Sequence, residues 1–237
     1  MKFIQKQHTG KGYQQLIKIH KNNGSYENDV KNDKSKKITV REDVLNDLLY
    51  EQGHICAYCM RSINSNSASI EHIVGQSFIN DKNENIGKNK DTDYKNMLAV
   101  CDGNVCGQDL HCDKSRANYQ DKRALLFISP LEKEQMKNIQ FSQSGKIYYK
   151  EPTDEINKEQ ETNEDNEIRY DLNTVLGLNC RTLVEHRGRT IKAVKSLLRK
   201  KNFNKKYAEK LLKPYLQETN KCEEFCQVTI LELCKHI

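Results

Sequence analysis

The spacing of the cysteines constrains this chain more than any other feature of its 237 residues. Cys56 and Cys59 form a C-x-x-C pair, and a second group at Cys101, Cys106 and Cys112 follows further along the chain. Zinc takes four ligands in a tetrahedron, and thiolates separated by two residues can occupy one edge of it. The pattern therefore predicts a structural zinc site with Cys56, Cys59 and Cys101 among its ligands.

The fourth ligand stays open among three residues. Cys106 and Cys112 both follow Cys101 at a workable spacing, and His111 is a further candidate. We favour Cys112 because it lies next to polar residues that a site must position. A zinc ion with four thiolates has no open position, so any chemistry must come from neighbouring side chains.

The composition limits the classes of protein to which this chain can belong. Apolar residues make up 36% of the chain and charged residues 30%, so the core is lean for this length and a metal would help to stabilise it. The chain has no run of ~18 apolar residues and no apolar leader at its start. We expect a cytoplasmic protein with no membrane association, in which nine cysteines are not a disulfide framework.

Charge is spread unevenly along the chain. The net charge is +6, and residues 187–213 hold eleven lysines or arginines and one acid. Such a run suits contact with phosphates, although a solvated helix face has the same composition. Residues 151–167 hold eight acids and few apolar residues, which favours a surface loop or linker.

The N-terminal half predicts one capped helix and one strand. Residues 1–37 are polar, are interrupted by glycines and indicate an extended polar arm. Thr39-x-x-Glu42 is a capping box that begins a helix, which Gly53 can end. Residues 69–74 indicate a strand. Asp93 can cap a short helix that runs through residues 97–100.

The C-terminal half predicts a hairpin followed by helices. Residues 140–142 and 146–149 form the hairpin, and residues 183–198 form a long amphipathic helix. Apolar and cysteine residues then recur every three or four positions from Cys222 to Cys234, which favours a buried helical stripe over a metal site. The predicted class is α+β, mainly helical.

Polar residues of the cysteine-rich segment indicate catalysis. Glu71 and His72 are adjacent on the predicted strand, where neighbouring side chains point to opposite faces. A neutral imidazole can deprotonate water near neutral pH. Asp113 follows a predicted zinc ligand, and its carboxylate can share a hard cation with Glu71. Taken alone, His72 would fit a buried core histidine and Asn96 a helix cap.

The order of these motifs resembles the HNH nuclease family, with its ββα-metal fold. The resemblance rests on the C-x-x-C pair, Glu71-His72-Ile73, Asn96-Met97-Leu98 and the segment from Cys101 to Asp113. The strings NMLAVC and HCDKSRAN are similar to a subgroup from bacterial anti-phage defence, the Septu-type nucleases that also occur in some retron operons. A zinc-stapled core would then span residues 38–122, followed by a helical region over residues 123–237.

The resemblance implies a role for each matching residue. His72 would be the general base, and Asn96 would hold the two arms of the motif in register through backbone contacts. Glu71 stands where the family usually has aspartate, and Asp113 where it usually has histidine or asparagine. An all-carboxylate pair favours Mg²⁺ or Mn²⁺ for the catalytic ion.

The resemblance also implies partners. The substrate would be a nucleic acid, DNA or tRNA, in the bacterial cytoplasm. An ATPase of the same defence operon would control the nuclease, with a retron reverse transcriptase and its DNA as further partners. The candidate phosphate contacts are basic residues of the core and of the long helix, namely Lys114, Arg116, Arg187, Arg189, Lys192, Lys195 and Arg199. The competing hypothesis is a zinc-ribbon module that binds nucleic acid without catalysis.

Overall fold

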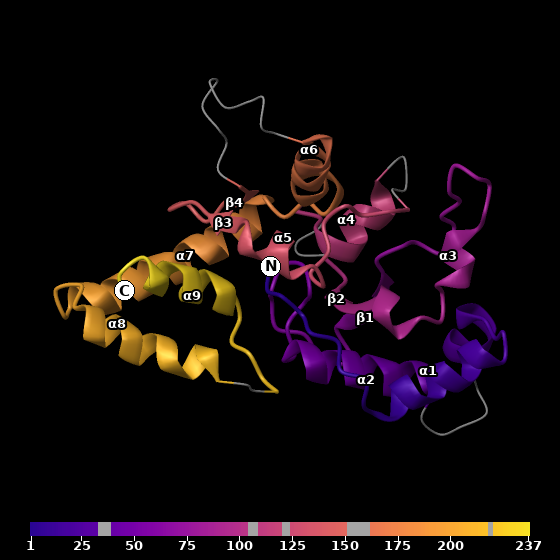
Figure 1. Cartoon of the computed structure of the whole chain (residues 1–237). Coiled ribbons are helices and arrows are strands. Elements are labelled where there is room, and N and C mark those ends of the chain that lie inside the picture. Colours follow the sequence, from indigo (N-terminus) through magenta and orange to yellow (C-terminus); the bar gives the residue numbers. More distant parts are fainter. Residues whose placement is uncertain (33–38, 104–108, 120–123, 151–161, 218–219) are drawn as a thin grey trace.

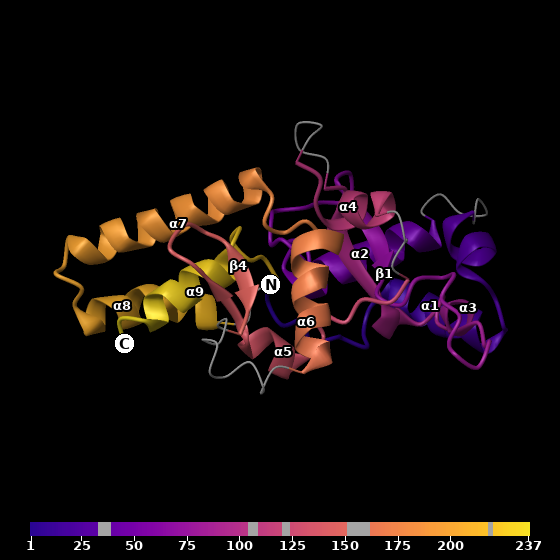
Figure 2. The same cartoon turned by 90° about the horizontal axis from the view of Figure 1, so that it is seen from above.

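The structure, a computed structural model, has an α+β fold dominated by helices. It describes residues 1–32, 39–103, 109–119, 124–150, 162–217 and 220–237. Within these ranges, two small antiparallel sheets of two strands each lie among the helices. Figures 1 and 2 show the N-terminal helices and the C-terminal helices in different halves of the molecule, with the first sheet beside the N-terminal helices.

The prediction of an extended arm over residues 1–37 is wrong, because this segment contains helix α1 (Lys11–Lys21) and a short π-helix, η1 (Tyr26–Lys31). Gly12 explains the difference. A Cβ at Gly12 would lie 2.3 Å from the backbone nitrogen of Val44, so the absent side chain lets α1 cross α2 closely. A glycine that suggests flexibility in the sequence therefore serves helix packing.

Helix α2 (Val40–Gln52) confirms the predicted caps. The Thr39 hydroxyl accepts from the Glu42 N–H, and the Glu42 carboxylate accepts from the Thr39 N–H. Gly53 ends the helix in the left-handed conformation at φ 70°. These local bonds satisfy the free backbone groups at both ends.

The first sheet pairs β1 (Ala68–His72) with β2 (Met97–Cys101) in antiparallel register, with Ala68 opposite Cys101 and His72 opposite Met97. The helix predicted through residues 97–100 is wrong. Asp93 caps only a short 3-10 turn, η2 (Tyr94–Asn96), before β2 begins. All five residues of β2 are buried, and such a short apolar run has no period that separates strand from helix.

Two further helices belong to the same part of the chain as this sheet. The short helix α3 (Ile86–Asn89) lies in the connection from β1 to β2, and α4 (Cys112–Asn118) follows β2 and packs against it. The chain thus passes through two strands and then a helix in the segment that holds the cysteines.

The remaining described elements form the C-terminal half, where the predicted hairpin and long helix are confirmed. Ile139 pairs with Tyr149 in the second sheet. In chain order the elements are α5 (Lys133–Lys137), β3 (Ile139–Phe141), β4 (Ile147–Tyr149), α6 (Asn163–Tyr170), η4 (Asp171–Val175), α7 (Arg181–Arg199), α8 (Lys205–Leu212), η5 (Lys213–Leu216) and α9 (Cys226–Cys234).

Two predictions for this half need correction. Residues 151–161 of the predicted acidic loop lie outside the described residues. The loop does not extend to residue 167, because α6 begins at Asn163 with a capping box formed by Thr162 and Asp165. The helical stripe predicted from Cys222 begins only at Cys226, because Phe225 adopts a left-handed conformation at φ 54°. Cys222 therefore precedes the helix.

Most of the buried apolar residues form one continuous core that extends from α1 and α2 through the first sheet to α7 and α9. A smaller core joins α7, α8 and α9. Across the described part of the chain, the helices lack the combination of length and apolarity that crossing a membrane requires.

Replacing Thr39 by alanine removes the hydroxyl that accepts from Glu42. We expect the free energy of unfolding to fall by about 1 kcal/mol, the usual cost of losing such a cap. Urea denaturation followed by circular dichroism measures the change. Thr39→Ser keeps the hydroxyl and should lose much less, and equal losses in both variants would contradict the contribution of the cap.

Candidate metal centre and adjoining pocket

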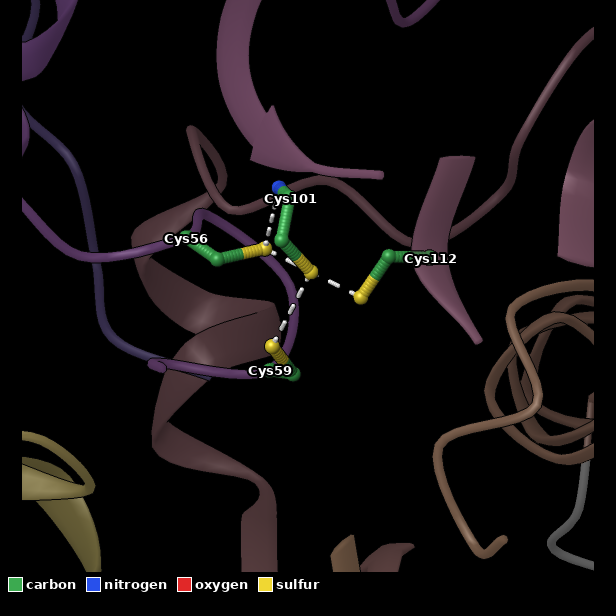
Figure 3. Close-up of side chains that lie close together, drawn as sticks. All are labelled: Cys56, Cys59, Cys101 and Cys112. Atoms are coloured by element: carbon green, nitrogen blue, oxygen red, sulfur yellow. Dashed lines mark hydrogen bonds between the residues drawn. The ribbon is translucent and has the colours of Figure 1, made fainter. Parts of the chain in front are cut away.

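Three separate segments bring four cysteines together (Figure 3). Cys56 and Cys59 lie in the turn after α2, Cys101 ends β2 and Cys112 begins α4. Their sulfur atoms all lie within 4.8 Å of one another, with Cys56 and Cys112 3.8 Å apart and Cys59 and Cys101 3.6 Å apart. Thiolates at ~2.3 Å from a tetrahedral zinc lie ~3.8 Å apart, so the cluster can bind a structural metal such as zinc.

The turn that carries the first two cysteines is held by backbone bonds. The Cys56 N–H donates to the Arg61 carbonyl at 2.8 Å, and the Met60 N–H donates to the Cys56 carbonyl at 3.0 Å. The Cys101 N–H donates to Cys56 Sγ at 3.3 Å, which stabilises a thiolate there. The backbone thus shapes the cluster before any metal enters.

Electrostatics favour a metal in the cluster. All four thiols are buried. Burial raises the pKa of Cys59 and of Cys112 well above the usual range, whereas at Cys56 contacts with the other three thiols outweigh burial and lower the pKa. Buried thiolates need a neutralising cation, and a bound metal ion removes the thiol protons outright.

The structure distinguishes between the candidates for the fourth ligand. Cys112 completes the cluster. His111 is fully buried beside it, with Nδ1 3.2 Å from Cys112 Sγ, and so contacts a ligand position. Cys106 lies outside the described residues.

A pocket of about 540 Å³ lies beside β1, and Asp113, the residue after Cys112, is part of its lining. It lies between β1, the start of α4 and the π-helix η1. Four of the predicted site residues line it, namely Glu71, His72, Asp113 and Arg116. The pocket therefore brings together residues that are 45 positions apart in the sequence.

His72 is held in one orientation. Its Nε2 lies 2.8 Å from the backbone carbonyl oxygen of Asp91, and its ring packs edge-on against Tyr26 at 4.7 Å. A carbonyl oxygen only accepts hydrogen bonds, so Nε2 carries the proton and Nδ1 of the neutral ring keeps its lone pair. Burial lowers the pKa of His72, which favours this neutral form.

Asn96 joins two stretches of backbone, one close to His72 in the sequence and the other close to it in the fold. Its Oδ1 accepts from the Val74 N–H at 2.8 Å, and its Nδ2 donates to the carbonyls of Val74 at 3.0 Å and Lys90 at 3.1 Å. The Asn96 carbonyl also accepts from the Ile73 N–H at 2.9 Å. These bonds connect the end of β1 to the segment that carries Asp91, the partner of His72.

Arg116 and Arg187 need correction as candidate phosphate contacts. Arg116 is 8% exposed, and its guanidinium pairs with Glu71 and donates to the carbonyl of His72 at 2.8 Å. Arg187 is 1% exposed and donates to the carbonyls of Gly145 at 2.7 Å and Leu178 at 2.6 Å. Both side chains serve packing because backbone carbonyls use their donors.

Two carboxylates of the pocket lie in a setting that disfavours their charge. Burial raises the pKa of Glu71 against the opposing effect of Arg116, and the charge of Asp113 raises it further. Burial also raises the pKa of half-buried Asp113, against a hydrogen bond from Ser69. A cation between two such oxygen donors would relieve this repulsion.

The other basic candidates lie on the surface. Lys114 is exposed on α4, and Arg189, Lys192 and Arg199 are exposed on α7, with Lys195 partly exposed. Helix α7 lies in the C-terminal half, away from β1 (Figures 1 and 2). Its basic residues therefore do not border the pocket.

Two cationic residues that are not among the predicted site residues also line the pocket. Lys31 comes from η1, where it pairs with Glu27 at 3.0 Å, and Arg41 comes from the first turn of α2. Both precede the cysteine-rich segment, and no motif marks them. Only the packing of η1 and α2 beside β1 brings them to the site.

Comparison of the sequence with protein-family models and with curated proteins gives no match. Its relation to any family therefore rests on the residues and geometry above.

We expect purified protein to hold about one zinc per chain, and Cys112→Ser to lose it, because the tetrahedron lacks one ligand. The free energy of unfolding should fall as well, since structural zinc contributes ~10–16 kcal/mol of binding energy in small zinc domains. Plasma mass spectrometry measures the zinc content. Cys106→Ser is the matched control, and loss of zinc from this variant but not from Cys112→Ser would contradict the assignment.

Proposed function

We propose that this chain is a metal-dependent HNH-type endonuclease, which hydrolyses phosphodiester bonds of nucleic acid. The observation that carries the proposal is the pocket beside the four-cysteine cluster. An oriented histidine and two carboxylates, His72, Glu71 and Asp113, line the same cavity, and all three lie in the order that the family resemblance implies.

His72 would act as the general base. The Asp91 carbonyl holds the proton on Nε2, so the free lone pair on Nδ1 can take a proton from water. The low pKa that burial causes keeps the ring neutral and ready to accept at neutral pH. Asn96 supports this geometry because it holds the backbone next to Asp91.

Glu71 and Asp113 would hold the catalytic ion. Oxygen donors of this kind fit Mg²⁺ or Mn²⁺, and burial of both groups favours a bound cation. Such an ion polarises the scissile phosphate and stabilises the leaving 3′-oxygen. Arg116 orients Glu71, while Arg41 and Lys31 supply positive charge where a phosphate would enter.

The substrate class is DNA or tRNA, because a water nucleophile needs no 2′-hydroxyl. The exposed basic residues of α7 can contact a longer nucleic acid or a partner, since they lie away from the pocket. The resemblance supports an ATPase of an anti-phage defence operon as that partner, with a retron reverse transcriptase and its DNA in one arrangement. Co-purification with such an ATPase tests this part, and a stable, active lone chain argues against it.

A non-catalytic zinc-ribbon module is the second candidate, favoured by the cysteine cluster and the net charge of +6. It requires neither the orientation of His72 nor the paired carboxylates. A nicking assay on plasmid and on tRNA, with Mg²⁺ or Mn²⁺, separates the two candidates, because only the nuclease cuts.

Replacing His72 by alanine removes the base, and we expect the cleavage rate to fall by about 10²–10⁴-fold. Zinc content and circular dichroism should stay unchanged, because His72 is not a zinc ligand. His8→Ala, at an exposed site outside the pocket, serves as the control. Cleavage at the normal rate by the His72 variant would sink the proposal.

Asp113→Asn tests the catalytic ion separately from zinc. The amide keeps the shape but loses the charge, so more Mg²⁺ or Mn²⁺ should be needed for half-maximal cleavage, and the maximal rate should fall roughly tenfold or more. A titration of each metal in the nicking assay measures both effects, with Asp102→Asn as the matched control. Unaltered metal dependence in Asp113→Asn would rule out its carboxylate as a ligand.

A further inference from the structure

A second group of thiols lies outside the four-cysteine cluster, where Cys222 and Cys226 meet the N-terminal segment. Lys2 Nζ lies 3.0 Å from Cys222 Sγ, although the two residues are 220 positions apart in the sequence. Cys226 is the first residue of α9. Both thiols and Lys2 line a pocket of about 430 Å³, which a small reagent can enter.

The surroundings shift the pKa values of the two thiols in opposite directions. The neighbouring Cys226 thiol and the Lys2 ammonium lower the pKa of Cys222 to about 5, against the effect of burial. The neighbouring Cys222 sulfur and burial raise the pKa of Cys226. These shifts favour a thiolate at Cys222 and a protonated thiol at Cys226.

The backbone holds Cys222 in place. Its N–H donates to the Gly53 carbonyl at 2.8 Å, and the Phe225 N–H donates to the Met60 carbonyl at 3.1 Å. Gly53 leaves room for the thiol, since a Cβ there would lie 2.5 Å from Cys222 Sγ. The pair is thus attached to the end of α2 and to the turn that follows Cys59.

Other polar groups also line this pocket. Glu223 accepts a hydrogen bond from the Tyr215 hydroxyl at 2.5 Å, and Lys221 also lines the pocket. The Lys2 ammonium is in hydrogen-bond contact with Cys222 Sγ. The site therefore combines a thiolate, a cation that stabilises it, an adjacent thiol and access from solvent.

We propose that Cys222 and Cys226 form a peroxide-reactive thiol pair. The Cys222 thiolate attacks one oxygen of hydrogen peroxide, the O–O bond breaks, and hydroxide leaves to give a sulfenic acid. The Cys226 sulfur then attacks the Cys222 sulfur, its proton leaves with the departing hydroxyl as water, and a disulfide forms. Two electrons pass from the two sulfurs to the peroxide.

Other thiols of the chain offer internal comparisons. Cys180 is partly buried, and burial raises its pKa. Cys234 is exposed. Neither lines the pocket that holds Lys2. Because thiolate character and access together set susceptibility to oxidation, Cys222 should react before both.

The first experiment needs no variant. The zinc-loaded full chain is treated with hydrogen peroxide at a small molar excess, and each cysteine is mapped by mass spectrometry with dimedone, a probe for sulfenic acids. We expect an intrachain disulfide between Cys222 and Cys226, with one peroxide consumed per bond and zinc retained. First oxidation at Cys180, at Cys234 or in the zinc cluster would overturn the proposal.

Two serine variants test the order of the steps. Cys226→Ser removes the resolving thiol, so the dimedone adduct on Cys222 should accumulate. Cys222→Ser should leave Cys226 unoxidised at the same peroxide concentration, because its proton remains in place. Cys234→Ser is the control with an unchanged pattern. A disulfide from Cys226 to another cysteine in the Cys222 variant would contradict the assigned roles.

The pH dependence tests the role of Lys2. The alkylation rate of Cys222 by iodoacetamide should stay nearly constant between about pH 6 and pH 8, since the thiol is already ionised. The rate at Cys180 should rise roughly tenfold per pH unit, because its thiolate fraction is still increasing. Lys2→Gln should slow alkylation of Cys222 at about pH 6 by roughly threefold or more, whereas Lys21→Gln should not. A steep pH profile for Cys222 in the unaltered chain would overturn the proposal.

Discussion

Four buried sulfur atoms determine where the rest of the site can lie. Cys101 ends β2 and Cys112 begins α4, so the cluster sets the position of the helix against the sheet. Asp113 is the next residue along the chain and therefore lies at a defined place beside β1. A metal ion would join three separate segments of a chain whose composition is lean in apolar residues.

A buried polar network extends this arrangement to the pocket. Arg116 reaches from α4 to Glu71 and to the carbonyls of His72 and Ile73, and so holds β1 against the helix. Asn96 binds the backbone of Val74, just past the same end of β1, and ties it to the segment that precedes Asp91. Because buried polar groups are costly unless they are bonded, such a network favours one arrangement of the pocket over all others.

Features that depend on neighbouring residues could be predicted from the sequence. The Thr39 capping box and the Gly53 cap involve residues within a few positions, and the structure contains both. The four cysteines of the candidate metal site also follow from spacing, together with one choice among Cys106, His111 and Cys112. The helix predicted through residues 97–100 is wrong because a short, fully buried apolar sequence fits a strand and a helix equally well. Only its pairing with β1 decides between the two.

The sequence by itself determined the chemistry available to this protein: thiols spaced for a metal, an imidazole beside a carboxylate, and caps that start and end α2. Tertiary structure decided which groups meet. It turned the Arg116 guanidinium inward, brought Arg41 to the pocket and placed Lys2 beside Cys222. The physical reason is that the partner of a long charged side chain depends on which segments pack around it. Those contacts join residues far apart in the chain, where no local pattern records them.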